Sequence, residues 1–206
     1  MEEVLDVYHL AYDPDYPVVC MDESTKQLTK EVTEPIAMSE NHPKLEDHEY
    51  ERNGVATIFA EVEPLGGRRH IKITERRTAE DWAEFVREML DERYPDAKKV
   101  HLVLDNLNIH TSASLYKTFP PEEAKRLADR LELHYTPVHG SWLNICEIEL
   151  SVLSRQCLAG RIKDMDTITS EVAKWQERRN NKEAKIDWQF TTEDARIKLK
   201  RLYPKL

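Results

Sequence analysis

The sequence predicts one α/β domain in which a central sheet is flanked by helices. Two β-rich stretches, 54–63 and 68–74, lie on either side of Pro64-Leu-Gly-Gly67 and predict an antiparallel hairpin. Two apolar stretches, 17–23 and 100–105, predict short buried strands that each run into an acid. Helical spacing of apolar residues occupies much of the remaining chain. Strands and helices that alternate in this way are typical of a sheet with helical layers.

The first residues predict a short helix that precedes the sheet. Val4, Leu5 and Tyr8 lie on one side of a helix over 1–12, and Asp13-Pro14 breaks it. A length of 206 residues fits a single domain. We therefore expect a linker remnant (1–16), a core (17–160) and a C-terminal helical extension of the same domain (161–206).

The first strand is expected to present a carboxylate at the edge of the sheet. Val18, Cys20 and Asp22 share one face of the strand over 17–23, because side chains alternate along a strand. We expect this strand to end at Asp22, and an ordinary strand-ending aspartate is the alternative interpretation. The polar stretch 24–50 has little periodicity and predicts a long loop.

The second strand of the predicted hairpin carries a basic stripe. Arg68, His70 and Lys72 face one way, whereas Ile71 and Ile73 face the other. Two interpretations stay open for this stripe: a solvated sheet edge, or a surface that contacts phosphates.

Caps, breakers and spacing define the remaining elements. Thr78 and Asp81 form a capping pair for a helix over 78–94, whose core stripe includes Trp82 and Phe85. The other expected elements are helices over 112–119 and 121–130, a strand over 131–135, a helix over 164–179, an extended segment over 187–190 and a last helix over 191–203.

A mostly apolar helix, expected to begin near Ser141 as its N-cap and to end near Cys157, has one polar stripe. The stripe consists of Asn144, Glu147, Ser151 and Ser154. Glu147 lies in its middle, and a carboxylate on a mostly buried helix is costly unless it is paired, hydrogen-bonded or bound to a metal. The sequence therefore predicts a partner for Glu147.

Three acids occupy comparable places: Asp22, Asp105 and Glu147. If the two strands are neighbours and the helix packs across them, the carboxylates converge and need cations to coexist. Hard oxygen ligands without cysteine or histidine favour Mg²⁺ or Mn²⁺ over zinc. Two such ions about 3.5–4 Å apart suit displacement at phosphorus. The alternative is three unrelated surface acids.

Composition narrows the class of protein without deciding its partner. The net charge is −9, yet residues 151–206 carry 13 basic and 8 acidic side chains. The acidic total disfavours nucleic acid as a partner, and the basic last quarter favours it. The sequence has no run of about 18 apolar residues and no signal peptide, so neither a membrane span nor secretion is expected. Cysteines in apolar stretches predict reduced thiols in a cytoplasmic protein.

Several blocks of the sequence resemble one family. The blocks are Met21-Asp22-Glu23, Leu104-Asp105-Asn106-Leu-Asn-Ile-His110 and the stretch from His134 to Glu147, with Asn53-Gly54, Arg178-Arg-Asn-Asn and Trp188-Gln-Phe-Thr-Thr-Glu-Asp-Ala195 beside them. They resemble the DDE transposases of mariner-related bacterial insertion sequences, over nearly the whole chain from about residue 17 onward.

The resemblance implies a ribonuclease H-like fold and a metal-binding triad made of Asp22, Asp105 and Glu147, with Mg²⁺ or Mn²⁺ as cofactor. Glu149 is a rival to Glu147, but the family pattern Leu-Asn-x-x-Glu selects Glu147, and a helical wheel turns Glu149 about 200° away. Glu23 is a weaker candidate ligand, because it points to the other face of its strand.

The same resemblance suggests residues that meet DNA. His110 and Asn106 either shape the loop of the second acid or contact DNA, and Trp142 either contacts the strand or packs in the core. The DNA-contact candidates are Arg68, His70, Lys72, His110, His139, Trp142, Asn144, Arg178 and Arg179, with Ser141, Lys182 and Lys185 beside them. A solvated helix face is the alternative for the C-terminal basic residues.

The implied function is metal-dependent DNA strand cleavage and strand transfer at insertion-sequence ends. Relatives carry an upstream helix-turn-helix region, which residues 1–16 cannot form, so we expect a helix-turn-helix partner or an upstream-encoded half, and a homodimer on DNA. Two alternatives remain: a ribonuclease H-like nuclease with another substrate, and a non-catalytic fragment that binds DNA or a transposase and regulates it.

Overall fold

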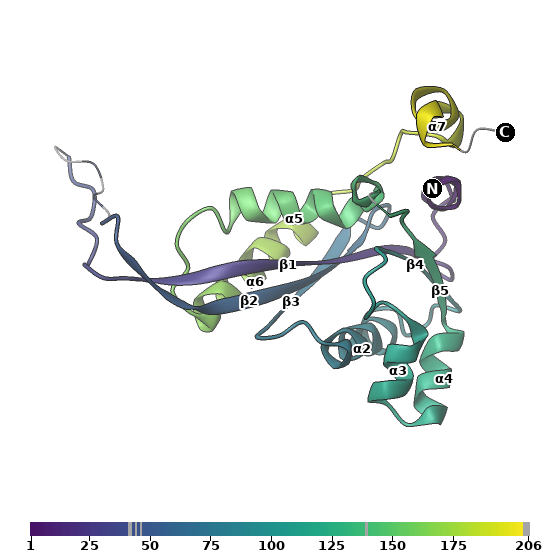
Figure 1. Cartoon of the computed structure of the whole chain (residues 1–206), viewed down its shortest axis with the longest axis horizontal. Helices are drawn as coiled ribbons and strands as arrows, with labels where there is room; N and C mark the ends of the chain where they lie inside the picture. The colour runs from purple at the N-terminus through teal and green to yellow at the C-terminus, as the bar shows by residue number, and fades with distance from the viewer. Residues whose placement is uncertain (41–42, 44, 46, 139, 204–206) are drawn as a thin grey trace.

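The computed structural model describes residues 1–40, 43, 45, 47–138 and 140–203. It contains a five-stranded mixed sheet in the order β3-β2-β1-β4-β5 (Figure 1). Strand β2 pairs antiparallel with β1 and with β3, whereas β4 pairs parallel with β1 and with β5. The strands are β1 (Val18–Glu31), β2 (Tyr50–Glu63), β3 (Arg68–Thr74), β4 (Val100–Leu104) and β5 (Leu131–Tyr135).

Helices cover both faces of this sheet. Helices α2, α3 and α4 lie on one face, and α5 and α6 lie on the other (Figure 1). Their bounds are α1 (Glu2–Tyr8), α2 (Ala79–Glu88) continued by the π-helical turn η1 (Met89–Arg93), α3 (Ser112–Thr118), α4 (Pro121–Asp129), η2 (Ser141–Leu143), α5 (Ile145–Gln156), α6 (Met165–Asn181), α7 (Thr192–Lys198) and η3 (Lys200–Leu202). Among the described helices, none is long and apolar enough to cross a membrane.

The central strand β1 is buried on both faces, which explains its continuous apolar run. Val19 and Met21 pack with Trp82 and the helices on the α2 side. Cys20 points to the other face and packs with Cys146 of α5. Asp22 shares the face of Cys20, because side chains alternate along the strand. The alternation therefore turns Asp22 toward α5.

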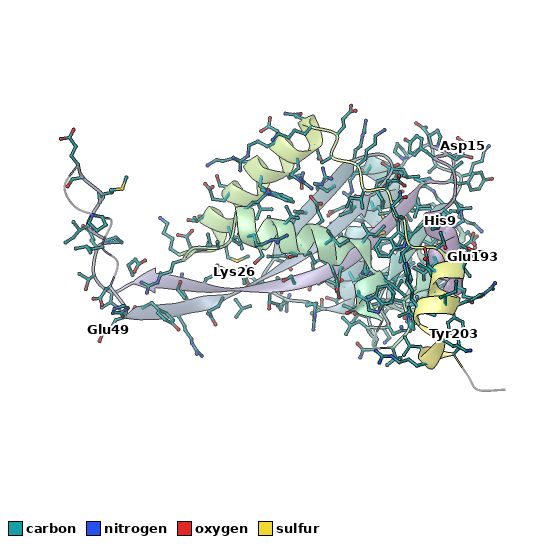
Figure 2. The ribbon with its side chains drawn as sticks, turned by 90° about the horizontal axis from the view of Figure 1, so that it is seen from above. His9, Asp15, Lys26, Glu49, Glu193 and Tyr203 are labelled. Carbon is teal, nitrogen blue, oxygen red and sulfur yellow. The ribbon has the colours of Figure 1, made fainter. Side chains whose placement is uncertain are left out.

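Strands β1 and β2 are longer than the sequence indicated. Residues 24–50 were predicted to form a loop, but β1 continues to Glu31 and β2 begins at Tyr50, so the prediction was wrong for 24–31 and for Tyr50. The two strands form a ribbon that projects from the rest of the domain, with Lys26 and Glu49 along it (Figure 2). The register of β1 shifts between Gln27 and Thr29, and this bulge interrupts the alternation of side chains. The sequence over this part of β1 therefore lacks the period-2 pattern that would predict a strand.

Tertiary packing stabilises the inner part of this ribbon. Leu28 of β1 and Ile58 of β2 are buried against Leu158 and Trp175 from the α5–α6 side. Lys26 Nζ also donates a hydrogen bond to the Leu158 carbonyl oxygen, at 2.6 Å. A two-stranded ribbon is marginal by itself, so contacts far along the chain decide where these strands extend.

The first 16 residues include helix α1, whose apolar side chains are buried. Val4 and Leu5 of α1 are fully buried, and the Tyr8 hydroxyl donates to the Leu143 carbonyl oxygen at 2.7 Å. Helices α1 and α7 lie close together (Figure 1), and Arg196 of α7 forms a bidentate pair with Glu2 at 2.8 Å. The divisions at residues 16 and 160 stay predictions; α6 packs directly on β3.

Candidate active site

The parallel pairing of β1 and β4 brings two of the predicted acids together. Cys20 and Val103 are register partners, and Asp22 and Asp105 each lie two residues further along. Neighbouring strands are about 4.8 Å apart, so the two aspartates occupy adjacent positions. Asp105 follows the last residue of β4, as predicted, whereas Asp22 lies inside β1. The expectation that β1 ends at Asp22 was therefore wrong; the site forms where β4 ends and β1 continues.

Helix α5 adds the third acid to the same pocket. Glu147 lies in the first turn of α5, which packs across β1 and β2. The pocket has a volume of about 470 Å³. Its lining residues are Asp22, Glu23, Ser24, Arg77, Asp105, Glu147, Leu150, Ser151 and Ser154. The sequence singled out Ser151 and Ser154 only as part of a polar stripe, and it did not single out Ser24 or Arg77, which no motif marks.

Asn144, and not Ser141, is the N-cap of α5. Its side-chain Oδ1 accepts a hydrogen bond from the Cys146 backbone N–H at 3.1 Å, and its Nδ2 donates to the Met21 carbonyl oxygen at 2.9 Å. Ser141 instead opens the short turn η2. The capping amide therefore joins the start of α5 to the residue before Asp22, and this bond fixes Glu147 relative to the strand.

The two rival glutamates of α5 point to different places. Glu149 is buried and accepts hydrogen bonds from Nε and Nη2 of Arg179, both at 2.8 Å. Arg69 Nε lies 3.0 Å from the same carboxylate. Glu147 is half-buried and lines the acidic pocket. The helical-wheel separation of these residues is confirmed: Glu149 is neutralised inside the protein, and Glu147 faces the site.

A buried histidine holds the second acid. His110 is fully buried, with Nδ1 2.7 Å from Asp105 Oδ1 and Nε2 2.8 Å from Glu23 Oε1. Burial alone lowers the pKa of His110, but the hydrogen bonds to Asp105 and Glu23 outweigh burial and raise its pKa to about 9. The imidazolium donates both protons, one to each carboxylate. Glu23 is thus tied to His110 on the far face of β1.

Electrostatic repulsion makes the pocket suitable for a cation. Burial, together with the charges of Glu23, Asp105 and Glu147, raises the pKa of Asp22 to about 7, against the lowering effect of a hydrogen bond from the Glu23 backbone N–H. The hydrogen bond from His110 lowers the pKa of Asp105. Hard carboxylate oxygens that repel one another are the donor set that Mg²⁺ and Mn²⁺ accept, so the residues fit such an ion.

The predicted basic stripe on β3 carries less charge than expected. Arg68 is exposed, but Lys72 pairs with Glu88 of α2 at 2.5 Å. His70 stacks on Phe85, with ring centroids 5.9 Å apart. Burial lowers the pKa of His70 to about 4, so its ring is neutral at pH 7. Only Arg68 of the stripe remains a good candidate for a phosphate contact.

The depressed pKa of His70 predicts how acid affects stability. The unfolded chain takes up this proton near pH 6.5, whereas the folded protein does so only near pH 4. The contribution of His70 is therefore intact above pH 6.5 and is lost as the pH falls toward 4. In urea denaturation, His70→Gln is expected to lose less stability than wild type between pH 7 and pH 4.5. Replacement of the exposed His48 by Gln should leave the wild-type loss unchanged; an equal loss in His70→Gln would contradict the assignment.

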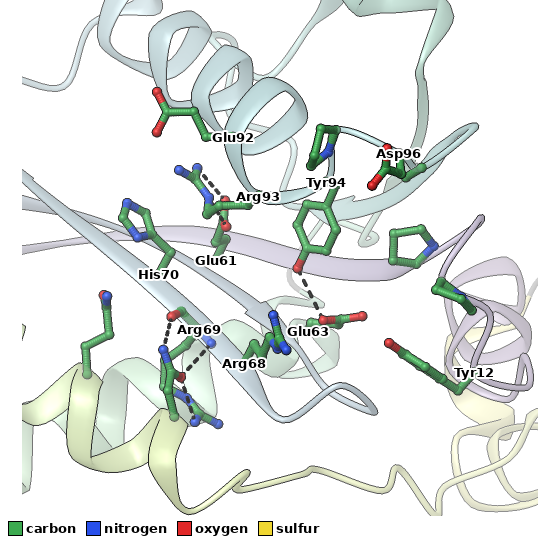
Figure 3. Close-up of a pocket in the computed structure, with 16 residues that line it drawn as sticks. Tyr12, Glu61, Glu63, Arg68, Arg69, His70, Glu92, Arg93, Tyr94 and Asp96 are labelled. Carbon is green, nitrogen blue, oxygen red and sulfur yellow. Dashed lines mark hydrogen bonds and ion pairs between the residues drawn. The ribbon is translucent and has the colours of Figure 1, made fainter.

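A second cavity of about 510 Å³ lies beside this stripe (Figure 3). Glu61 pairs with Arg93 in its wall, with Arg93 Nη2 3.0 Å from Glu61 Oε2. The Tyr94 hydroxyl donates to Glu63 at 3.5 Å. Glu61 and Glu63 therefore already have partners within the wall of this cavity. The acidic pocket remains the stronger candidate for chemistry.

The other DNA-contact candidates divide by exposure. Asn144 and His110 are fully buried. Asn144 caps α5, and His110 contacts the carboxylates of Asp105 and Glu23. Arg179 is paired with Glu149, whereas Arg178 is exposed. Trp142 is 42% exposed and meets Phe190 edge-on. Asn106 donates a hydrogen bond to the Thr136 carbonyl oxygen. The side chains of Ser141, Lys182 and Lys185 are exposed, and His139 lies outside the described residues.

Known structures share this fold. The chain is similar to the mariner Mos1 paired end complex with Mg (TM-score 0.58, 15% identity, 91% of this chain and 54% of that chain). It is also similar to the Mos1 paired end complex with Mn (TM-score 0.57, 15% identity, 86% and 52%) and to the Mos1 strand transfer complex (TM-score 0.52, 12% identity, 79% and 46%). The chain spans about half the length of these proteins.

These likenesses confirm the predicted ribonuclease H-like fold with its mixed sheet. No curated protein sequence matches the chain. The family profile described as "DDE superfamily endonuclease" matches residues 17–169, which is most of the chain and includes all three acids of the pocket. This protein therefore belongs to the DDE superfamily endonuclease family.

Proposed function

We propose that this chain is the catalytic part of a transposase, which cuts DNA strands at the ends of an insertion sequence and joins the freed 3′ hydroxyl to target DNA. The observation that carries the proposal is the pocket that Asp22, Asp105 and Glu147 share at the end of β4. Membership of the endonuclease family supports cleavage of a phosphodiester bond. The Mos1 structures support transposition as the process.

In this proposal the three acids hold Mg²⁺ or Mn²⁺, as two ions. When bound, such ions activate the attacking oxygen and stabilise the leaving one in an in-line displacement at phosphorus. His110 keeps Asp105 oriented by donating to its Oδ1, so the other oxygen of that carboxylate is left for the pocket. The capping amide of Asn144 holds α5, and with it Glu147, against β1. The Mos1 complexes named for Mg and Mn support either ion.

We propose DNA as the partner, both transposon ends and target. Arg77, in the wall of the acidic pocket, is the basic side chain best placed for a phosphate near the cut. Arg68, Trp142, Arg178, Lys182 and Lys185 are further candidates on the described surface. The paired end complexes of Mos1 support a homodimer on DNA. A helix-turn-helix partner or upstream-encoded half would read the end sequence, in the bacterial cytoplasm.

Cleavage of matched substrates tests this function against its alternatives. We expect the protein with Mn²⁺ to nick duplex DNA and to spare an RNA–DNA hybrid of the same sequence, and we expect EDTA to stop the reaction. Preferred cleavage of the hybrid would replace transposition by a ribonuclease H-like activity. DNA binding without any cleavage in Mn²⁺ or Mg²⁺ would favour the non-catalytic, regulatory alternative.

A further inference from the structure

A second group of potential ligands lies at the opposite end of the parallel strands. His101 of β4 is the register partner of Glu132 of β5, and His134 is two residues further along β5. Alternation therefore places the three side chains on one face of two neighbouring strands. Among the described residues, these are the three histidine, cysteine or acidic side chains whose donor atoms all lie within 4.8 Å of one another.

The donor atoms surround a common point. His101 Nδ1 lies 3.1 Å from His134 Nε2. Glu132 Oε2 lies 3.7 Å from His101 Nδ1, and Oε1 of the same carboxylate lies 3.8 Å from His134 Nε2. Ligand atoms about 2.0–2.2 Å from a tetrahedral zinc ion are about 3.3 Å apart. The three observed separations lie around this value, so an ion fits with small side-chain rotations.

Glu3 of α1 fixes the protonation of one ligand. His134 Nδ1 lies 2.8 Å from Glu3 Oε1, and a carboxylate can only accept in this contact. His134 Nδ1 therefore carries the proton, and Nε2 turns a lone pair toward His101 and Glu132. A carboxylate that orients the far nitrogen of a histidine ligand is the usual outer partner in protein metal sites.

We propose that His101, Glu132 and His134 form a site for a transition-metal ion of the Zn²⁺ type, separate from the catalytic acids. Two imidazoles and one carboxylate suit zinc, cobalt or nickel and not Mg²⁺, which requires oxygen ligands. Glu132 is exposed at 48% of its side chain, so water can complete the fourth position. Asp105 lies four residues further along β4, which is about 13 Å at 3.3 Å per residue.

A bound ion would join three parts of the fold. It would bridge β4 and β5 directly, and through His134 and Glu3 it would fasten α1 to the edge of the sheet. Helix α1 also contacts α7 at the other end of the chain. The site therefore acts on the packing of both chain ends and not on the chemistry at Asp22 and Asp105.

Zinc titration of the metal-free full chain tests the site. We expect one Zn²⁺ per chain in competition with a chromophoric chelator, and we expect Asp105→Asn to keep this ion because the catalytic acids do not hold it. His101→Ala should weaken binding at least about 100-fold, and Glu132→Gln at least about tenfold, since each removes a direct ligand or its charge. Co²⁺ should give the visible absorption of a four-coordinate ion, and His101→Ala should lose it.

Matched variants separate this site from general effects. His48→Ala removes an exposed histidine elsewhere and should bind Zn²⁺ as wild type does. Glu132→Gln changes a half-exposed side chain, so its circular dichroism and thermal midpoint without metal should match those of wild type. The proposal is overturned if wild type binds no Zn²⁺, in which case a proton shared by the two imidazoles accounts for their contact. It is equally overturned if both ligand variants keep wild-type affinity, or if Asp105→Asn loses the ion.

Discussion

Asp105→Asn is expected to lower the rate of Mn²⁺-dependent DNA nicking at least about 10³-fold. The substitution keeps the shape of the side chain but removes the charge that the pocket offers to a cation at the end of β4. A metal ion supplies several kcal/mol of transition-state stabilisation, and about 4 kcal/mol corresponds to 10³ in rate. The measurement is single-turnover nicking of a labelled duplex at saturating protein, with Mn²⁺ binding followed by calorimetry in parallel.

Asp91→Asn is the matched control. Asp91 is a surface aspartate whose carboxylate pairs with Arg126 at 2.7 Å, on the side of α4. Its loss removes the same chemical group without touching the acidic pocket, so cleavage should stay near the wild-type rate. If Asp105→Asn cut DNA as fast as Asp91→Asn, the pocket would not be the active site. Calorimetry then shows whether the carboxylates bind Mn²⁺ at all.

Glu149→Gln is expected to lower the free energy of unfolding by about 3–5 kcal/mol. Glu149 neutralises two arginines, and the side chain of Arg69 has no solvent exposure. A neutral amide of the same size leaves those guanidinium groups buried without a counter-charge, and removal of one member of a buried ion pair carries a cost of this size. Urea denaturation of the metal-free protein at pH 7 measures the effect.

Glu147→Gln, on the same helix, is expected to affect cleavage and not the free energy of unfolding. Glu147 has like charges near it in the pocket, so loss of its charge relieves repulsion with Asp22 and should leave stability unchanged or slightly higher. The same variant should lose cleavage, because in the proposed mechanism Glu147 is one of the three acids that hold the metal. Glu149→Gln, assayed at a temperature where it is folded, should retain cleavage. A stable, active Glu147→Gln together with a folded but inactive Glu149→Gln would reverse the two assignments.

Local patterns were sufficient wherever one segment carries its own signal. The hairpin around Gly67, which has a positive φ of 68°, and the capping box of Thr78 and Asp81 form as predicted. Spacing on a helical wheel separated Glu147 from Glu149, because turning by 100° per residue is a property of the helix itself. Asp22, Asp105 and Glu147 were likewise chosen from the sequence, and the structure brings them to one pocket.

Local sequence patterns did not predict the interactions between segments that lie far apart in the chain. The extension of β1 depends on Leu158 and Trp175, which cover a strand whose own pattern is broken by a bulge. The contact of Glu23 with His110 joins residues 87 positions apart. The neutral state of His70 comes from burial, which no composition reveals.

The sequence by itself determined the class of fold and most element positions, and it selected three acids that the structure brings to one pocket, since each of these depends on local periodicity or on a contiguous motif. Only the tertiary structure decided the environment of each charged side chain. Glu149 is a buried counter-ion of Arg179, and His110 holds the carboxylate of Asp105. His101 contacts His134 across two parallel strands. The physical reason is that desolvation and pairing depend on neighbours that folding brings together from distant parts of the chain.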